Sequence, residues 1–341
     1  MVISVKKLDS VKTPGGERSL LGEKLPLEMP YLIQIFPVYA CNFKCGYCLH
    51  SLDRKLHGYI SEETLMPLER FKKIVDDIKL SGVKIKMLRF AAIGEPLLHP
   101  QISEMVEYAN KAGIAESIDI VTNGALLTKE LSAKLIEAGL SKLRISLEGL
   151  SREDYKNNAF VDINFDAFVE NIKYFYDNKK NTKMYIKIID YMVQKDEEKE
   201  KFYSLFSTIT DDIAIEHLTP TIQEIDYVAL SNGMQTNKPQ NGDKLLSSNI
   251  CSQPFYMMQI NPDANVVPCC SMKYPCVLGN IDKNSVQEVW QGKEFNAFRR
   301  MMLKGERDNC KVCSECTLYL YDMHKEDVLD DFVEKLCREY I

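Results

Sequence analysis

The sequence predicts an α/β protein, a partial (β/α)6 TIM-like barrel followed by a small α+β domain rich in cysteine. Two observations favour the barrel: apolar β-like segments alternate with helical patterns six times, and no G-x-G-x-x-G turn follows the first strand. A third observation favours the added domain, because the cysteines gather in two clusters, Cys41–Cys48 and Cys251–Cys316. We therefore expect two sites that depend on thiol chemistry.

The barrel elements follow from apolar, β-branched runs and from the helical periodicity between them. Two helices begin with capping patterns, Ser61-Glu62-Glu63 and Thr128-Lys129-Glu130. A strand after each helix implies right-handed βαβ units and a parallel sheet. The expected strands are Leu32–Val38, Ile85–Ala91, Ser117–Thr122, Lys142–Leu147, Met184–Ile189 and Asp212–Leu218. The expected helices lie near residues 62–80, 101–113, 128–139, 164–179 and 195–207.

The chain is expected to divide into five parts. The lead-in is irregular because it contains Pro14-Gly15-Gly16, and a later polar, turn-rich stretch predicts a linker or a loop that closes over substrate. A terminal segment has Val328, Phe332, Val333 and Leu336 at helical spacing, so Cys337 is interpreted as a packing residue. The five parts are the lead-in (1–30), the barrel (31–220), the linker (221–250), the cysteine-rich domain (251–320) and a C-terminal helix (321–341).

Composition narrows the class of protein. A formal net charge of −6 argues against non-specific nucleic-acid binding, which requires clustered Lys and Arg. No apolar run approaches the roughly 18 residues needed to span a bilayer, and no apolar segment follows the first basic residues, so we expect neither a membrane span nor a signal peptide. Eleven cysteines in clusters, without an export signal, indicate metal ligation in a reducing compartment, which predicts a cytoplasmic protein.

The first cluster has the spacing C-x3-C-x2-C: Cys41, Cys45 and Cys48 lie on the loop that leaves the first strand. Three thiolates on a short loop hold three corners of a cubane iron–sulfur cluster and leave one iron without a protein ligand. An open metal position binds a reacting molecule. The alternatives are a structural zinc site or three unrelated thiols.

This motif, with Tyr47 before its last cysteine, resembles the signature of the radical S-adenosylmethionine (SAM) enzymes. The resemblance implies that Cys41, Cys45 and Cys48 ligate a [4Fe–4S] cluster whose open iron binds SAM, and that Tyr47 packs near the adenine. It also implies reductive cleavage of SAM to a 5′-deoxyadenosyl radical, which abstracts a hydrogen atom from the substrate. The electron is expected from a flavodoxin- or ferredoxin-type reductant.

Residues after the next strands match further parts of the family pattern. Gly94-Glu95 is similar to the glycine–glutamate motif that receives the SAM amino group, although Ile93 stands where a second glycine is commoner. Asn123 lies in a turn that edges the SAM pocket in the family, with a plain Asn-Gly turn as the alternative. Ser146 and Glu148 are expected beside the ribose and the methionine carboxylate, and no fifth-strand glycine motif is assigned. The two polar residues at the end of the sixth strand, Glu216 and His217, are substrate candidates.

The second cluster follows the linker. A strand Phe255–Ile260, a turn and Val266-Val267 form a hairpin that returns Cys269 close to Cys251, and a helical run, Ser285–Leu303, precedes the last cysteines. This arrangement resembles the SPASM and shorter "twitch" extensions of radical SAM enzymes, and its spacing is nearer the single-cluster form. The resemblance implies one auxiliary [4Fe–4S] cluster on Cys251, Cys269, Cys313 and Cys316. Cys310 competes with Cys316, Cys270 and Cys276 are spare, and zinc is the alternative metal.

The resemblance implies hydrogen abstraction but leaves the substrate open. We expect dehydrogenation of a small molecule, a sugar, nucleotide-sugar or aminocyclitol, with the auxiliary cluster as electron acceptor. The alternatives are an epimerase, with Cys270 or Cys276 returning a hydrogen atom, and a peptide-modifying enzyme that matures ribosomal peptides. A non-enzymatic iron–sulfur electron carrier or a zinc-held scaffold is the alternative of another class.

Overall fold

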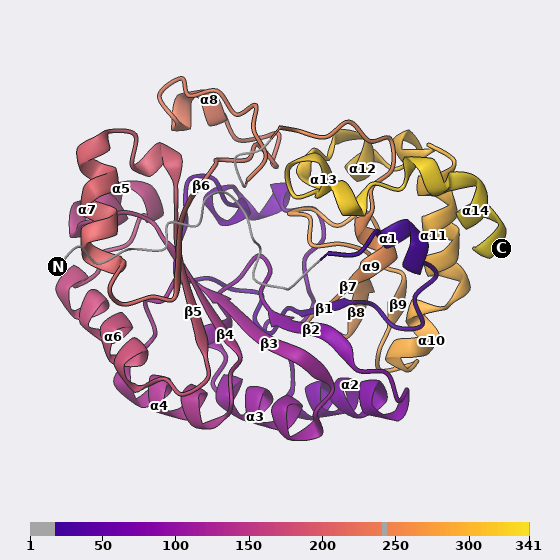
Figure 1. Cartoon of the computed structure of the whole chain (residues 1–341), viewed down its shortest axis with the longest axis horizontal. Helices are drawn as coiled ribbons and strands as arrows, with labels where there is room; N and C mark the ends of the chain where they lie inside the picture. The colour runs from indigo at the N-terminus through magenta and orange to yellow at the C-terminus, as the bar shows by residue number, and fades with distance from the viewer. Residues whose placement is uncertain (1–17, 241–243, 341) are drawn as a thin grey trace.

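The computed structural model describes residues 18–240 and 244–340, so the Pro14-Gly15-Gly16 part of the lead-in lies outside the described residues. Nine strands form one sheet in the order β6-β5-β4-β3-β2-β1-β7-β8-β9. The first six strands are parallel, as predicted, and helices cover the outside of their fan (Figure 1). The strands are β1 (Leu32–Ile35), β2 (Ile85–Phe90), β3 (Ala115–Thr122), β4 (Lys142–Leu147), β5 (Lys183–Ile189), β6 (Asp212–Glu216), β7 (Met257–Ile260), β8 (Asn265–Val267) and β9 (Gly279–Asn280).

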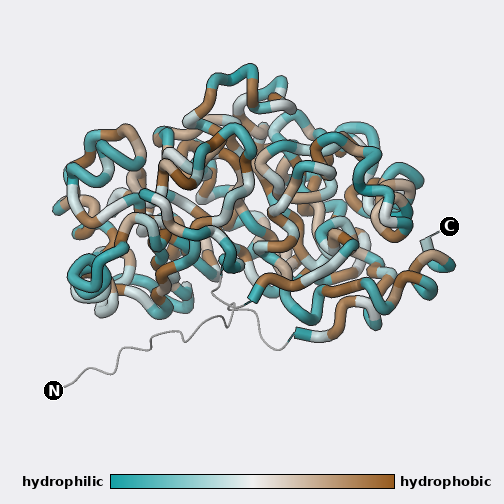
Figure 2. Tube along the Cα trace, turned by 90° about the horizontal axis from the view of Figure 1, so that it is seen from above, coloured by the Kyte–Doolittle hydropathy of each residue, from teal (hydrophilic) through white to brown (hydrophobic). Residues whose placement is uncertain are grey.

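The helices between the barrel strands lie on its outer side, where Figure 2 shows hydrophilic residues along the rim of the molecule. None of the helices within the described ranges combines the length and apolar character needed to cross a lipid bilayer. The helices are α1 (Leu21–Lys24), α2 (Leu68–Leu80), α3 (Ile102–Ala112), α4 (Lys129–Glu137), α5 (Arg152–Ala159), α6 (Phe165–Asn178), α7 (Asp196–Phe206), α8 (Tyr227–Leu230), α9 (Gln253–Tyr256), α10 (Val286–Trp290), α11 (Lys293–Leu303), α12 (Lys311–Glu315), α13 (Leu318–Tyr321) and α14 (Val333–Glu339).

The two faces of the barrel strands differ in chemistry because successive side chains on a strand point to opposite sides. On β2, the Phe90 ring packs against Phe71 of α2, with ring centroids 5.4 Å apart, and Leu88 is also fully buried. Arg89 lies between these two residues and therefore faces the barrel interior. The outer face thus supplies the apolar core against the helices, and the inner face is polar.

The predicted start of the first long helix is wrong. The Ser61 side chain donates to the Glu63 carbonyl instead of capping a helix, and α2 begins only at Leu68. Pro67 disfavours helical backbone at the residue before it, so the helix does not extend back through Met66. Leu65 there pairs with Val38 in an isolated antiparallel bridge. Thr128, in contrast, caps α4 as predicted and accepts a hydrogen bond from the Leu131 backbone.

Five other parts of the structure differ from the expectation. Helix α5 is absent from the predicted list, and the run Ser285–Leu303 is two helices, α10 and α11, which separate at Gly292. A Cβ at Gly292 would lie 2.7 Å from the Glu288 carbonyl oxygen, so only glycine fits at the point where the two helices separate. The segment 321–341 is not one helix, because short 3-10 turns precede α14. The 221–250 stretch contains α8, and the lead-in contains α1.

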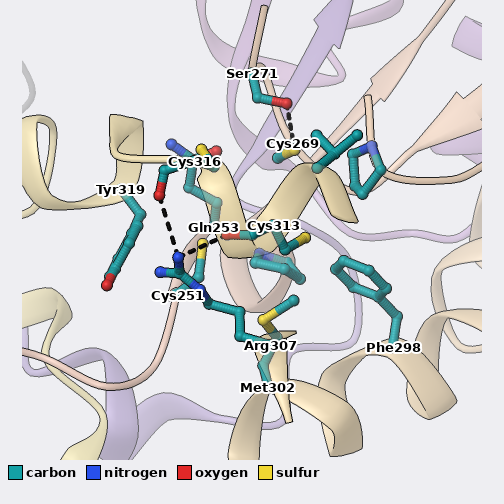
Figure 3. A pocket seen from close by; sticks show the side chains of 13 residues that line it. Cys251, Gln253, Cys269, Ser271, Phe298, Met302, Arg307, Cys313, Cys316 and Tyr319 are labelled. Atoms are coloured by element: carbon teal, nitrogen blue, oxygen red, sulfur yellow. Dashed lines mark hydrogen bonds between the residues drawn. The ribbon is translucent and has the colours of Figure 1, made fainter. Parts of the chain in front are cut away.

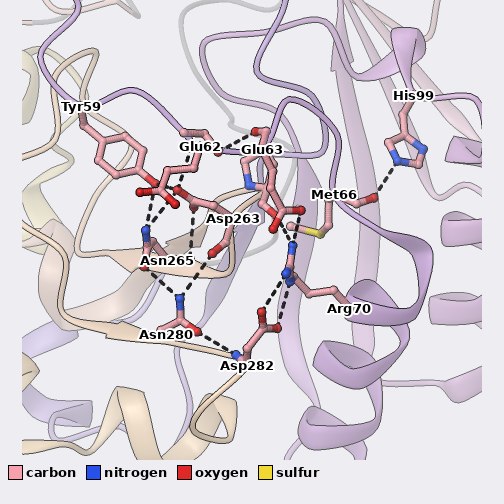
Figure 4. A network of polar contacts seen from close by, with 12 residues as sticks. Tyr59, Glu62, Glu63, Met66, Arg70, His99, Asp263, Asn265, Asn280 and Asp282 are labelled. Atoms are coloured by element: carbon pink, nitrogen blue, oxygen red, sulfur yellow. Dashed lines mark hydrogen bonds and ion pairs between the residues drawn. The ribbon is translucent and has the colours of Figure 1, made fainter.

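The cysteine-rich region continues the barrel sheet. Strand β7 pairs in parallel with β1, in a register that sets Gln259 beside Gln34, and their side chains hydrogen-bond at 2.6 Å. Arg70 of α2 adds a second connection (Figure 4): it forms ion pairs with Glu63 and Asp282 and donates to the Pro262 carbonyl. The hairpin that carries Cys269 is therefore fixed directly to the barrel.

Candidate functional site

The loop that carries the first three cysteines leaves β1 at the carboxyl ends of the parallel strands, where the sites of such barrels lie. Helix α5 holds this loop in place: the Lys44 amide donates to the Ala159 carbonyl and the Gly46 amide to the Asn158 carbonyl, both at 3.0 Å. Ser151 begins α5 by accepting a hydrogen bond from the Asp154 amide. The helix that sequence periodicity missed is thus the support of the cysteine loop.

The three thiols of this loop lie close together in a poorly solvated place. Burial raises the pKa of Cys41 to about 12 and that of Cys48 to about 11, and burial with the nearby Glu148 carboxylate raises the pKa of Cys45. Each of these thiols also interacts electrostatically with at least one of the others or with Glu148. Such thiols ionise readily only beside a cation, because a bound metal deprotonates a coordinating thiol.

The donor set fits an iron–sulfur cluster in its chemistry. Within the described ranges, no three His, Cys, Asp or Glu side chains are arranged to share a single metal ion. Each thiolate of a cubane binds its own iron, so its ligands do not need to converge on one point. Cys41, Cys45 and Cys48 are the residues that would hold such a cluster.

Tyr47 joins the cysteine loop to the end of β4. Its hydroxyl donates to Oε1 of Glu148 at 2.7 Å, and its ring makes an edge contact with Tyr191, with centroids 6.4 Å apart. Glu148 is 1% exposed, and its Oε2 atom is buried without a hydrogen-bond partner. Burial raises the pKa of Glu148 to about 7, although Tyr47 and Cys45 oppose this effect. An unsatisfied buried carboxylate oxygen is a position at which a ligand donor would be stabilised.

Gly94 and Glu95 lie where a side chain would not fit. A Cβ at Gly94 would approach the Val38 carbonyl to 2.1 Å and the Phe36 ring to 2.7 Å, so only glycine allows this loop to pass so close to the end of β1. The Glu95 carboxylate accepts from Thr122 Oγ1 (2.6 Å), the Leu97 amide (2.9 Å) and the Asn123 amide (2.8 Å). Glu95 therefore ties the loop after β2 to the turn after β3.

The two other predicted SAM contacts, Asn123 and Ser146, differ in their distance from the three thiols. Asn123 donates to Asn42 at 2.8 Å, and its Nδ2 is 4.0 Å from Cys41 Sγ, so the turn after β3 contacts the cysteine loop. Ser146 is half-buried on β4 and pairs in register with Lys187 of β5. The structure thus brings Tyr47, Gly94, Glu95, Asn123 and Glu148 together around the three thiols, whereas Ser146 belongs to the inner face of the strands.

The two candidates at the end of β6 have different surroundings. Glu216 is buried and contacts Tyr185 (2.8 Å), Lys187 (2.6 Å) and Gln240 (2.5 Å). Burial alone would raise the pKa of Glu216, but the Lys187 ammonium and these hydrogen bonds lower it overall. His217 is partly exposed and pairs through Nδ1 with Asp190 at 2.5 Å.

A second group of thiols lines a cavity in the cysteine-rich region, as Figure 3 shows. Cys251, Cys269, Cys313 and Cys316 line it, whereas Cys310 does not. Burial raises the pKa of Cys269 to about 11. These are the four ligands that the sequence favours, and they are the residues that would hold an auxiliary cluster.

Arg307 orders the backbone around this cavity. It donates to the carbonyls of Cys313 (2.6 Å) and Cys316 (3.2 Å), and its guanidinium lies over the Tyr319 ring, 4.3 Å from the centroid. The arginine thus fixes the C-x2-C turn from both ends.

The remaining thiols have separate positions. Cys310 lies close enough to both Cys313 and Cys276 to interact with them electrostatically. Cys270 contacts Gln253 at 3.8 Å on the other side of the hairpin. Cys337 is exposed on α14, so the interpretation that it packs in the core is wrong, because Leu336 takes the buried position.

Sequence reasoning missed a set of charged residues on the inner face of the barrel. Their signal was present: a charged residue alternates with apolar ones on central parallel strands, whose two faces are usually both apolar. Arg144 pairs with Asp119 at 3.2 Å, and Lys187 pairs with Glu216 at 2.6 Å. The set consists of Arg89, Asp119, Arg144 and Lys187.

Comparisons with known proteins match both of the regions that contain the cysteine clusters. Residues 35–207, about half of the chain, match the radical SAM superfamily, and residues 251–317 match an iron–sulfur cluster-binding domain, SPASM. A GTP 3′,8-cyclase from Chlorobaculum tepidum is 37% identical over 123 residues, which is 36% of this chain but only 34% of that protein. A tungsten-containing aldehyde ferredoxin oxidoreductase cofactor-modifying protein from Pyrococcus furiosus is 24% identical over 80% of this chain and 84% of its own length.

Solved structures share the fold. SuiB from Streptococcus suis, bound to S-adenosylmethionine, aligns with a TM-score of 0.62 at 16% identity, over 92% of this chain and 79% of that one. BtrN, in complex with AdoMet and 2-DOIA, aligns with a TM-score of 0.54 at 19% identity, over 85% and 93%. The chain belongs to the radical SAM superfamily and is an enzyme with a SPASM domain. Its cofactors are S-adenosylmethionine, the [4Fe–4S] cluster of the radical SAM domain and auxiliary iron–sulfur clusters of the SPASM domain.

Proposed function

We propose that this enzyme dehydrogenates a small polar molecule held between its two thiol sites. When bound, the first cluster and SAM supply a 5′-deoxyadenosyl radical that takes a hydrogen atom from the substrate, and an auxiliary cluster accepts the next electron. A secondary alcohol would lose its C–H hydrogen atom, then one electron and the hydroxyl proton, and become a carbonyl. SAM cleavage would consume one electron from the external reductant and oxidation of the substrate radical would return one through the auxiliary cluster, so SAM would be the only net oxidant.

The observation that supports this proposal is the polar inner face of the barrel. A hydrophobic substrate would find few apolar partners among Arg89, Arg144 and Lys187, whereas the oxygen atoms of a hydroxylated substrate would accept hydrogen bonds from them. Cys41, Cys45 and Cys48 would hold the SAM-binding cluster at the strand ends. Cys251, Cys269, Cys313 and Cys316 would hold one auxiliary cluster in the cysteine-rich region.

Other residues of the chain have supporting roles in this proposal. Tyr47 and Glu148 would orient the SAM side of the pocket, and Gly94 would allow its backbone to approach closely. Residues 221–240 would act as a cover, because the Gln240 side chain reaches Glu216 in the barrel while the Gln240 backbone amide donates to the Tyr321 carbonyl. We also propose that the five parts of the chain meet at residues 30, 220, 250 and 320.

A peptide-modifying function is the second candidate. SuiB was also solved bound to its precursor peptide SuiA, in a chain that aligns with a TM-score of 0.61. The fold is therefore compatible with both kinds of substrate, and the substrate assay must include both.

The experiment is an anaerobic incubation of the reconstituted enzyme with SAM, dithionite and candidate sugars, nucleotide-sugars, aminocyclitols or peptides. Dehydrogenation predicts a product two hydrogens lighter, formed together with 5′-deoxyadenosine. A product with the mass of the substrate in H2O, but heavier in D2O because it takes up deuterium from the solvent, would instead indicate epimerisation and contradict the proposal.

A further inference from the structure

Arg89 occupies the middle of the polar inner face. Its neighbours in register are Gln34 on β1 and Asp119 on β3, so it lies between the strand that leads to the first cysteine loop and the next strand of the fan. Its Nη2 contacts the Met87 sulfur at 3.0 Å, and its Nε is buried without a hydrogen-bond partner. A guanidinium has five donors in a planar fork, and here most of them find no strong acceptor.

The other inner cations are neutralised by carboxylates. Asp119, which is fully buried, pairs with Arg144, and Glu216 pairs with Lys187. In the described part of the chain, no carboxylate lies within ion-pair distance of Arg89. Burial and the like charge of Arg144 lower the pKa of the Arg89 guanidinium. Keeping an unpaired cation in such a place costs free energy, which a bound anion would offset.

Residues from the part of the chain after the barrel also approach Arg89. Asp322, just after α13, and Cys270, next to the proposed cluster ligand Cys269, are close enough to interact with Arg89 electrostatically. Burial raises the pKa of Asp322, which weakens it as a partner for the guanidinium. Arg89 is therefore within electrostatic range of residues on both the barrel and the C-terminal part of the chain.

We propose that Arg89 is the anchor for an oxyanion of the substrate, a carboxylate or a phosphate group, held by the guanidinium fork on the inner face of β2. This inference rests on the proposed function, because it takes the barrel interior as the substrate site. Two parallel N–H···O bonds would fix the anion and thereby orient the rest of the molecule between the two thiol sites. The enzyme would thus select acidic or phosphorylated substrates over neutral ones.

The experiment titrates the anaerobic holoenzyme with inorganic phosphate, and separately with malonate, at constant ionic strength set by sodium chloride. Thermal unfolding and calorimetry report binding. We expect saturable binding of at least one of these anions, and Arg89→Gln should weaken it by about tenfold or more, as the loss of a charged hydrogen bond implies. Whichever anion binds more tightly identifies the oxyanion source.

Three further variants are compared with Arg89→Gln. Arg89→Lys retains the charge without the fork and should bind between the wild type and Arg89→Gln, even if the latter folds poorly. Asp322→Asn removes a nearby negative charge and should bind as tightly as the wild type or more tightly. Arg338→Gln changes an exposed arginine that pairs with Glu334 and should bind like the wild type.

Binding of both anions by Arg89→Gln with wild-type affinity would overturn the proposal, as would the absence of saturable binding to the wild type. The readout needs no SAM cleavage. An enzyme that binds phosphate through Arg89 but dehydrogenates nothing would refute the proposed function and leave the anion site standing.

Discussion

The Tyr47 hydroxyl donates to Glu148 Oε1 at 2.7 Å, so a residue between two of the proposed cluster ligands is fastened to the end of β4. The Asn158 side chain holds the Glu148 carbonyl at 2.8 Å, and the Asn158 carbonyl in turn receives the Gly46 amide. This closed set of hydrogen bonds positions the loop before any cofactor binds.

Tyr47→Phe should weaken SAM binding by about five- to tenfold, as loss of a hydrogen bond to a charged group implies. Equilibrium dialysis with the reconstituted enzyme measures the affinity for SAM. An unchanged affinity would show that these hydrogen bonds do not shape the SAM pocket.

Gly94→Ala should disrupt the cofactor site because the added methyl would meet the Val38 carbonyl and the Phe36 ring. We expect a loss of stability of about 2 kcal/mol or more, together with reduced SAM binding. Gly82→Ala is the matched control: Gly82 has φ +72° with nothing within 4 Å of an added Cβ, so it should lose about 1 kcal/mol and leave SAM binding intact. Equal SAM affinity in the two variants would contradict the proposed close approach.

Glu95 predicts a pH dependence of stability in the metal-free protein. Burial raises its pKa from 4.5 to about 7, so between these values the folded state binds more protons than the unfolded state. The free energy of unfolding should therefore fall as the pH rises from about 5 to about 7, by up to roughly 3 kcal/mol from this group. Urea unfolding of Glu95→Gln should show a smaller slope over this range. A slope equal to that of the wild type would exclude Glu95 as its source.

The choice of auxiliary ligands can be tested by iron content. Cys313→Ser should lower the iron bound per reconstituted chain from about eight to about four, because two cubanes become one. Cys310→Ser should keep both clusters, since Cys310 does not line the cavity. Iron analysis with Mössbauer spectroscopy distinguishes them. Loss of one cluster in Cys310→Ser with retention in Cys313→Ser would reverse the assignment.

The polar contacts of Arg70 predict how firmly the cysteine-rich region is joined to the barrel. Arg70→Ala removes two ion pairs and a bond to the Pro262 carbonyl, which should cost about 1–3 kcal/mol of unfolding free energy. Lys111→Ala breaks an exposed pair with Glu107 on the same helix, α3, and should change stability by less than about 0.5 kcal/mol. Equal losses of unfolding free energy in the two variants, measured by urea unfolding, would show that the Arg70 contacts do not stabilise the junction between the barrel and the cysteine-rich region.

The sequence allowed much of this fold to be predicted, because local pattern determines it. The parallel strands and the residues at their carboxyl ends follow from apolar runs and turns, and five of the predicted site residues gather around the three thiols. Helix α5 was missed because only Tyr155 and Ala159 of its residues are buried, so its apolar periodicity is weak. The parallel pairing of β7 with β1 joins segments more than two hundred residues apart, which local periodicity does not encode.

The inner face of the barrel shows that the candidate site, like the fold, is only partly predictable from the sequence. Alternation in Leu88-Arg89-Phe90 indicates two unlike faces, but the sequence does not say which cations find carboxylates. Arg144 and Lys187 acquire theirs from neighbouring strands, and Arg89 does not. This difference arises only when the strands are placed in register.

The most direct test of the central claim is electron paramagnetic resonance of the reduced, anaerobically reconstituted enzyme before and after addition of SAM. The account predicts a cluster signal that changes when SAM binds the open iron, followed by formation of 5′-deoxyadenosine, and the loss of both in Cys45→Ala while the auxiliary signal remains. A signal unaffected by SAM, with no 5′-deoxyadenosine formed, would contradict it.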